Sequence, residues 1–235
     1  MNFEDIIKAI GIEPYYRNWQ SDIVIYNADC REILPKIPDK SIDLVLTDPP
    51  YGVGDTMSGT KGKSRAHKAK YIGFVDNIEY VINNVIPSVE LCLDKSKRVI
   101  VTPGSKCLRY YPLWDSYGSL YSNTSTGMQI WGAMDSQPII YYGRPYDIGI
   151  RIKHCSYEIS ERPSCKEHPC SKPMKLWTKI LSDRADINDI ILDPFLGSGT
   201  TAVAAKILGR KCIGIEISEK YCEIAKKRLA QGVLW

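Results

Sequence analysis

The most constraining feature of this sequence is the repeated alternation of short apolar runs with helical patterns. Residues 23–26, 42–47 and 99–101 are compact runs rich in Ile, Val and Leu, and a polar residue follows each of them. Runs of this length and composition are typical of buried strands. Between the last two, apolar side chains recur at helical spacing over residues 78–89. Strands joined by helices return in the same direction, so the pattern predicts a mostly parallel sheet covered on both faces.

The same alternation returns in the last quarter of the chain. A strand over residues 190–192, a helix over 200–208 and a strand over 212–215 are followed by a helix that begins near Ser218. We therefore predict an α/β fold with a doubly wound, mostly parallel sheet. In such sheets, ligands bind at the carboxyl ends of the strands.

The middle of the chain departs from this pattern, because it is rich in aromatic and turn-forming residues. Strands are expected at residues 128–131 and 139–142, which we interpret as a hairpin within a small insertion. The predicted organisation is one domain in three parts, with boundaries at 1–103, 104–167 and 168–235.

Composition limits the class of protein. With 235 residues, of which 44% are hydrophobic and 25% charged, the chain suits one large α/β domain. Its eight cysteines are scattered and its first residues lack a secretory signal pattern, so we expect reduced thiols and a cytoplasmic protein. No apolar run approaches the roughly 20 residues of a membrane span, which argues against a membrane role. A net charge of +4 permits binding to nucleic acid without requiring it.

A glycine-rich loop at residues 193–200, Asp-Pro-Phe-Leu-Gly-Ser-Gly-Thr, joins a predicted strand to a predicted helix. Glycines there let a ligand approach backbone amides at the positive end of the helix, so the loop predicts a nucleotide or cofactor site. Glu216 ends the next strand, at the spacing of an acid that binds ribose hydroxyls. Taken alone, the loop also fits NAD, which leaves a dehydrogenase as an alternative.

Two motifs together resemble one enzyme family. The Asp-x-Phe-x-Gly-x-Gly pattern at residues 193–199 is similar to the S-adenosylmethionine loop of amino-methyltransferases, and Asp-Pro-Pro-Tyr at 48–51 is similar to their catalytic motif. Because the catalytic motif comes first, the chain resembles the permuted beta class of DNA amino-methyltransferases. The resemblance implies a Rossmann-like fold, S-adenosylmethionine as cofactor, a catalytic half at 1–103, a target-recognition insertion at 104–167 and a cofactor-binding half at 168–235.

The resemblance also assigns residues to the cofactor. Residues 168–173 are similar to the family segment that lines the methionine pocket, and residues 27–30 are similar to an acidic motif in which relatives often have glycine where this chain has Ala28. It implies that Glu216 binds the ribose and that Asp193 organises the loop or faces the methionine amine. The full set of expected cofactor-binding residues is Asp29, Lys172, Asp193, Phe195, Gly197, Ser198, Gly199, Thr200 and Glu216.

The residue types at 48–51 suit methylation of an exocyclic amine. The lone pair of such an amine is delocalised into its ring, so it needs acceptors that orient it toward the methyl donor. The Asp48 carboxylate and the Pro49 carbonyl can accept its two N–H groups, while Pro50 helps to stiffen the turn. Tyr51 offers an aromatic face for a base rotated out of the duplex.

Basic residues gather directly after this motif. Residues 53–75 show no apolar periodicity, and we predict that they contact DNA phosphates, which makes double-stranded DNA the expected partner. The alternative is an ordinary solvated surface loop. The residues expected to bind DNA are Lys61, Lys63, Arg65 and Lys68.

A second group of side chains invites a zinc interpretation. It consists of His154, Cys155, Cys165, His168 and Cys170. Its cysteines form no Cys-x₂-Cys pair, and one of its histidines belongs to the segment that resembles the methionine pocket, so no metal site is predicted.

The predicted function is methylation of adenine at N6. In the resembled family, Asp at the position of Asp48 accompanies adenine more often, and Ser accompanies cytosine. Cytosine N4 is the alternative, an RNA target is more distant, and the intact motifs disfavour a DNA-binding subunit without catalysis. The insertion is small for reading a target, so we expect either a short target sequence or a second subunit that shares the work, as in a homodimer. A cognate restriction enzyme is a further candidate partner.

Overall fold

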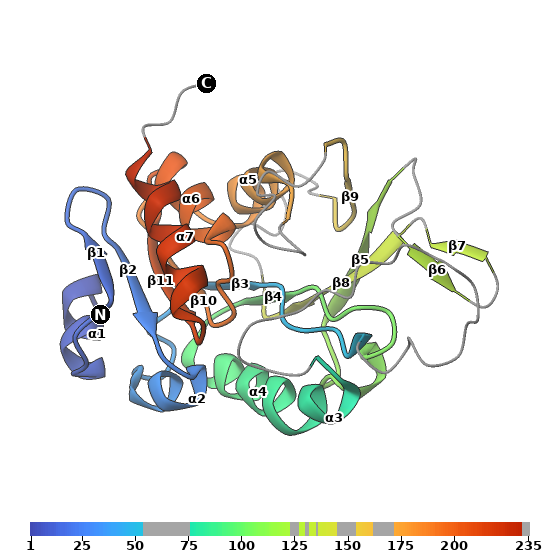
Figure 1. The fold of residues 1–235 in the computed structure, drawn as a ribbon, viewed down its shortest axis with the longest axis horizontal. Helices are drawn as coiled ribbons and strands as arrows, with labels where there is room; N and C mark the ends of the chain where they lie inside the picture. The colour runs from blue at the N-terminus through green and yellow to red at the C-terminus, as the bar shows by residue number, and fades with distance from the viewer. Residues whose placement is uncertain are drawn as a thin grey trace.

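The computed structural model describes the chain in seven stretches, residues 1–53, 76–122, 127–129, 132–134, 136–144, 154–161 and 172–231. They form three layers, with helices on both faces of a central sheet (Figure 1). Within these stretches the sheet has nine strands, in the order β1-β2-β11-β10-β3-β4-β8-β5-β9. The predicted α/β class with a doubly wound sheet is confirmed.

Neighbouring strands at the centre of the sheet run parallel to one another. They are β2 (Ile23–Asn27), β11 (Lys211–Glu216), β10 (Ile190–Asp193), β3 (Leu44–Thr47) and β4 (Val99–Val101). Each was predicted from its apolar run, and burial on both faces explains why these runs lack polar alternation. Because the strands are parallel, their carboxyl ends meet at one edge of the sheet, where Asp48, Asp193 and Glu216 lie.

Further strands extend the sheet at both sides. These are β1 (Tyr16–Asn18) beside β2, and β8 (Ser136–Tyr142), β5 (Ser116–Tyr121) and β9 (Tyr157–Glu158) beyond β4. The apolar run at 139–142 lies in β8, where Ile139 and Ile140 are fully buried in the central sheet. A separate two-stranded sheet joins β6 (Gly127–Gln129) to β7 (Gly132–Met134). The two strands predicted in the middle of the chain therefore belong to different sheets and do not pair with each other as the expected hairpin.

The helices divide between the two faces of the sheet (Figure 1). One face carries α1 (Phe3–Ile10), α2 (Cys30–Ile33), α3 (Ile78–Tyr80) and α4 (Ile86–Lys95), and the other carries α5 (Met174–Arg184), α6 (Thr200–Ile207) and α7 (Glu219–Ala230). Short 3₁₀ turns occupy Leu34–Lys36 and Leu108–Tyr110. Alternate strand residues supply the two cores, so Val24 packs on the α1 side and Ile23 on the α5 side.

A π-helical turn, Val81–Val85, interrupts the helix predicted over residues 78–89. Pro87 stands in the first turn of α4 and has no N–H to donate, so the α-helical ladder cannot pass through it unbroken. The wider turn buries Val81 and Val85 but leaves Ile82, which was expected on the apolar face, 40% exposed.

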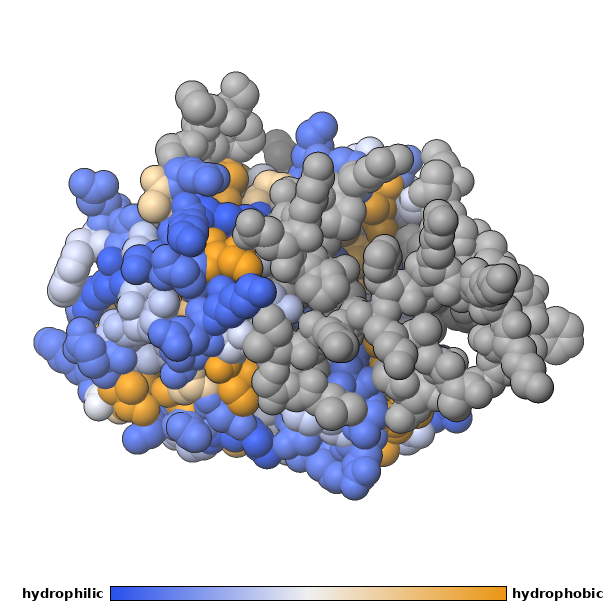
Figure 2. Space-filling view, in the orientation of Figure 1, coloured by the Kyte–Doolittle hydropathy of each residue, from blue (hydrophilic) through white to orange (hydrophobic). Residues whose placement is uncertain are grey.

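The surface over α1 and α7 is mostly hydrophilic (Figure 2). Apolar side chains are concentrated instead in the two cores on either side of the sheet. Among the described residues, none of the helices combines the length and apolar character that crossing a bilayer requires.

Candidate active site

A pocket of about 920 Å³, counting the open solvent at its mouth, lies at the carboxyl ends of the parallel strands. The pocket is lined by residues 48–51 after β3, by residues 193–198 after β10, by Glu216 at the end of β11 and by Lys172 just before α5. Two motifs that are far apart in the sequence therefore share one cavity.

Asp48 directly follows β3 and is the centre of a cluster of polar side chains. Its Oδ1 atom accepts hydrogen bonds from the hydroxyls of Tyr51 and Thr102. Its Oδ2 atom lies 2.6 Å from Nζ of Lys172, which also donates to the Tyr51 hydroxyl at 2.8 Å. The Asp48 and Lys172 side chains are only 18% and 13% exposed, so this ion pair is held largely away from water.

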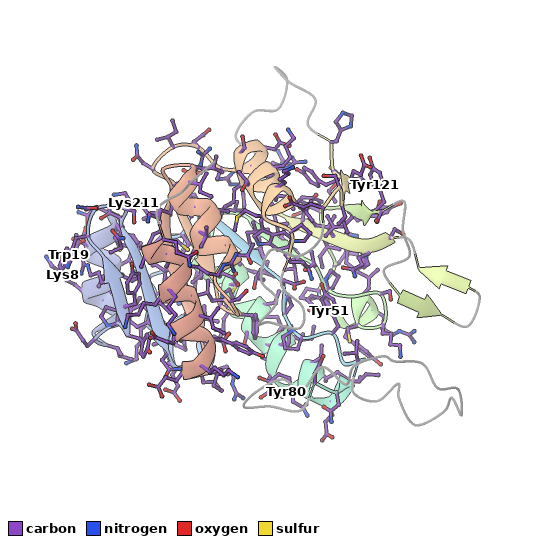
Figure 3. All side chains as sticks on the ribbon, turned by 45° about the horizontal axis from the view of Figure 1, so that its top comes forward. Lys8, Trp19, Tyr51, Tyr80, Tyr121 and Lys211 are labelled. Atoms are coloured by element: carbon purple, nitrogen blue, oxygen red, sulfur yellow. The ribbon has the colours of Figure 1, made fainter. Side chains whose placement is uncertain are left out.

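The segment after β4 supports Tyr51, which lines the pocket together with Tyr80 of α3 (Figure 3). Gly104 has a φ of +67°, and a Cβ built there would lie 2.8 Å from Cγ of Tyr51, so only glycine lets the ring approach so closely. The buried Cys107 thiol donates to the Tyr51 carbonyl at an Sγ···O distance of 3.1 Å. The turn after β3 is therefore fixed by the turn after β4.

Asp193 ends β10 and is 3% exposed. It accepts hydrogen bonds from the hydroxyls of Thr47 and Thr201, at 2.7 and 2.6 Å, and from the Phe195 amide at 3.1 Å. Burial raises the pKa of Asp193 to about 6, although the three hydrogen bonds act in the opposite direction. These contacts make Asp193 the residue that ties the glycine loop to β3 and α6.

Glu216 ends β11 and faces the glycine loop. Its carboxylate oxygens accept hydrogen bonds from the amides of Gly197 and Ser218, each at 2.8 Å. Burial, more than the nearby charge of Asp193, raises the pKa of Glu216 to about 7. A carboxylate oxygen can accept two hydrogen bonds, so each of these oxygens can also take a hydroxyl group. This set of acceptors fits the ribose of a nucleoside cofactor.

The two glycines of the loop have different surroundings. Both have positive φ, +55° at Gly197 and +83° at Gly199. Gly197 lines the pocket, whereas a Cβ at Gly199 would lie 2.6 Å from Cβ of Ala225 on α7. Packing of the start of α6 on α7 therefore also requires glycine at Gly199, and its role toward the cofactor stays a prediction.

Arg228 of α7 holds the loop from outside the pocket. Its Nη1 atom donates to the carbonyl and hydroxyl oxygens of Ser198, at 2.7 and 3.1 Å, and to the Thr200 hydroxyl at 3.2 Å. The Arg228 guanidinium thus joins Ser198, before Gly199, to Thr200, the first residue of α6.

Asp29 stands at the N-cap of α2 and lines the pocket. Its carboxylate accepts from Arg31, with Nη2 2.5 Å from Oδ2, and these hydrogen bonds lower the pKa of Asp29. Arg31 Nη1 also donates to Asn84 in the π-helical turn at 2.5 Å. Both oxygens of Asp29 therefore already bind Arg31, and the role of Asp29 toward the cofactor stays a prediction.

Some of the predicted residues lie outside the described stretches. They include the expected DNA-binding residues Lys61, Lys63, Arg65 and Lys68, and the His168, Cys165 and Cys170 of the zinc interpretation. Within the described stretches, no group of three or more His, Cys, Asp or Glu side chains is arranged to hold a metal ion.

Comparison with known proteins places the chain in a family. A family model described as DNA methylase matches residues 114–227, which include the glycine loop and Glu216. The type II methyltransferase M2.LlaDCHI of Lactococcus lactis subsp. cremoris is 30% identical over 269 residues, covering 95% of this chain and 94% of that protein. The chain belongs to the DNA methylase family. The predicted resemblance to S-adenosylmethionine-dependent DNA amino-methyltransferases is confirmed.

Other relatives agree with this placement. The type II methyltransferase M.ScaI of Streptomyces caespitosus is 27% identical to this chain. The alignment covers 96% of this chain and 86% of M.ScaI. The solved PvuII DNA methyltransferase, described as cytosine-N4-specific, has a TM-score of 0.69 at 18% identity, covering 96% of this chain and 92% of that one. The M1.HpyAVI–SAM complex has a TM-score of 0.62 at 24% identity, covering 88% of this chain and 99% of that one. At these identities, the solved structures establish the shared fold.

Sequence patterns missed several residues of the methylase site. Thr102, Gly104 and Cys107 follow β4, and Arg228 lies in the last helix. A signal for Thr102 was available, because a hydroxyl directly after a predicted strand falls at the same sheet edge as Asp48. The contacts of Gly104 and Arg228 depend on packing between distant segments, which no local pattern reveals.

The raised pKa of Glu216 makes the stability of the free methylase depend on pH. Its pKa is about 7 in the folded protein, above its ordinary value of 4.5, so the folded state binds more protons and loses stability as pH rises between these values. We expect thermal unfolding of Glu216→Gln to show less loss of Tm than the wild type between about pH 5 and pH 8. If the plots of Tm against pH were parallel for the two proteins, the raised pKa of Glu216 would be contradicted, even if one protein had a lower Tm throughout.

Proposed function

We propose that this methylase transfers a methyl group from S-adenosylmethionine to the N6 amino group of adenine in double-stranded DNA. The observation that carries the proposal is the shared pocket, because the Asp48 cluster and the glycine loop with Glu216 face one cavity. An amine bound at Asp48 and a cofactor bound at Glu216 would occupy neighbouring parts of that cavity. A dehydrogenase or a DNA-binding subunit without catalysis has no use for the polar cluster around Asp48.

The proposed cofactor site is the half of the pocket around the glycine loop. Glu216 is suited to accept the two ribose hydroxyls. Gly197, Ser198 and Thr200 border the pocket at the start of α6, where backbone amides and the helix dipole favour polar ligand groups, and Phe195 adds apolar surface. When bound, S-adenosylmethionine supplies an electrophilic methyl group on a positively charged sulfur.

The proposed amine site is the half of the pocket around residues 48–51. The Asp48 carboxylate and the Pro49 carbonyl accept the two N–H groups of the target amine, which directs its lone pair toward the cofactor half. The Tyr51 ring stacks on the base rotated out of the duplex, and Pro50 helps to keep the turn rigid. Support comes from the fixed position of Tyr51, which Gly104 and Cys107 hold in place.

Adenine is proposed over cytosine because Asp48 heads the motif, as in the adenine-specific members of the resembled family. Cytosine N4 is the second candidate, favoured by the likeness to the PvuII enzyme described as cytosine-N4-specific. Nucleoside mass spectrometry of DNA from cells that express the methylase tests the choice. We expect N6-methyladenine to accumulate above the level in cells that carry an empty vector, and N4-methylcytosine as the main product would contradict the choice.

We also propose that the basic residues after the motif contact DNA phosphates. Replacing Lys61, Lys63 and Lys68 together by Gln is expected to reduce the slope of log affinity against log salt by about 0.9 per lysine, for specific and non-specific duplexes alike. Filter-binding titrations over a range of salt concentrations measure this slope. The control is Lys8→Gln, since Lys8 on α1 is exposed and lies far from Tyr51 in Figure 3. An unchanged slope in the triple variant would reject the phosphate contacts and favour the alternative that residues 53–75 are an ordinary solvated loop.

Target reading is proposed for residues 104–167, because the described residues that line the pocket all lie outside this segment. Three strands of this segment, β5, β8 and β9, extend the central sheet, and β8 is separated from β3 only by β4. A homodimer and a cognate restriction enzyme are the proposed protein partners.

A further inference from the structure

Hydrogen bonds to Asp48 limit where a target amine can bind. An ionised carboxylate has about four acceptor positions, two on each oxygen. Within the described part of the chain, Oδ1 takes two donors, the hydroxyls of Tyr51 and Thr102. Oδ2 takes one, the ammonium of Lys172 at 2.6 Å. The acceptor position left for an incoming amine is therefore on Oδ2, beside Lys172.

The surroundings of Lys172 hold it at this place. Its side chain is 13% exposed, and an ammonium so far from water needs polar partners, which Asp48 and the Tyr51 hydroxyl supply. Pro173 follows it at the N-cap of α5, and Trp177 of that helix donates to the Thr201 hydroxyl at 2.9 Å. The segment that carries Lys172 is thus anchored to α6 beneath the glycine loop.

We propose that Lys172 is a positioning residue of methyl transfer, which fixes the Asp48 carboxylate and the Tyr51 hydroxyl so that one acceptor position of Oδ2 faces the target amine. The resemblance alone assigns Lys172 to the cofactor, whereas its contacts join it to the catalytic motif. The inference rests on the proposed function. It implies that Lys172 acts on the rate of transfer and not on the affinity for S-adenosylmethionine.

The test compares Lys172→Met and Lys172→Arg with the wild type. Met keeps the length and the apolar stem of the side chain but removes the donor, whereas Arg keeps a charged donor. Single-turnover methylation of duplex DNA gives the rate, and calorimetric titration with S-adenosylmethionine alone gives Kd. We expect Lys172→Met to lower the rate about a hundredfold while Kd changes by less than about threefold. Lys172→Arg is expected to recover part of the lost rate, because it keeps a charged donor to Asp48.

Lys175→Met is the matched control, because the Lys175 side chain is 79% exposed and belongs to the same segment. We expect wild-type values for both the rate and Kd of this variant. A Kd for Lys172→Met that rises as much as the rate falls would overturn the proposal and make Lys172 a cofactor ligand. An unchanged rate would overturn it as well. If Lys172→Met does not fold, Lys172→Gln replaces it under the same criteria. A wild-type protein that methylates no DNA base would instead reject the proposed function.

Discussion

Asp48→Ala is expected to lower the rate of methyl transfer by at least about a thousandfold while S-adenosylmethionine still binds. The reason is that the Asp48 carboxylate is the acceptor that orients the target amine, whereas the proposed ribose ligand, Glu216, lies at the end of a different strand. The same change leaves the ammonium of Lys172 without its charge partner, so a lower Tm is expected too. Single-turnover kinetics and calorimetric titration with the cofactor measure the two effects separately.

Asp39→Ala is the control for this variant. Asp39 is also paired with a lysine, Lys95, but its side chain is 74% exposed, and we expect its loss to leave the rate unchanged. Near-full activity in Asp48→Ala would remove residues 48–51 as the catalytic centre. A cofactor Kd that rises as steeply as the rate falls would place the cofactor, and not the target amine, on Asp48.

Gly199→Ala is expected to destabilise the folded methylase by about 3 kcal/mol or more, since a left-handed backbone and an overpacked contact add together. Gly199 has a φ of +83°, and its new Cβ would lie 2.6 Å from Cβ and 3.1 Å from Cα of Ala225. Neither atom of Ala225 can move without shifting α7. Chemical denaturation of the protein without cofactor measures the change in free energy of unfolding.

Gly209→Ala separates the two causes of this loss. Gly209 also has positive φ, +67°, but apart from its own chain neighbours no heavy atom of the described residues lies within 4 Å of the Cβ position, so only the backbone cost of about 1–2 kcal/mol is expected. Adding Ala225→Gly to Gly199→Ala removes one of the two clashing atoms and is expected to recover part of the stability. Equal losses at Gly199 and Gly209 would show that packing against α7 has no part in the requirement for glycine.

The parallel half of the fold follows from local pattern, and the rest does not. The strands β2, β3, β4, β10 and β11 are buried on both faces, so they stand out in the sequence as short apolar runs without polar alternation. The sequence of β5, Ser116–Tyr121, contains Gly118, which weakens a strand prediction. In the structure, a Cβ at Gly118 would lie 1.8 Å from the Cys155 carbonyl oxygen, so the glycine is required by a distant segment that crosses it.

The candidate site also has residues that were predictable from the sequence and contacts that were not. Asp48, Asp193 and Glu216 each follow or end a recognisable strand, so their meeting at one edge of the sheet was predictable from the order of strands and helices. The hydrogen bond from Thr102 to Asp48 joins residues 54 positions apart, and the pairing of Lys172 with Asp48 crosses the whole middle segment. Such contacts depend on how the two halves of the chain pack together, which periodicity and motif spacing do not contain.

Transfer of an isotopically labelled methyl group tests the central claim most directly. Purified methylase is incubated with plasmid DNA and S-adenosylmethionine that carries a deuterated methyl group, and the DNA is digested to nucleosides for mass spectrometry. We expect the intact deuterated methyl group on the exocyclic amine of 2′-deoxyadenosine, and no label with Asp48→Ala. Label on the amine of 2′-deoxycytidine would keep the catalytic centre and change the base. Label on neither amine, in a protein that binds both DNA and cofactor, would contradict the account.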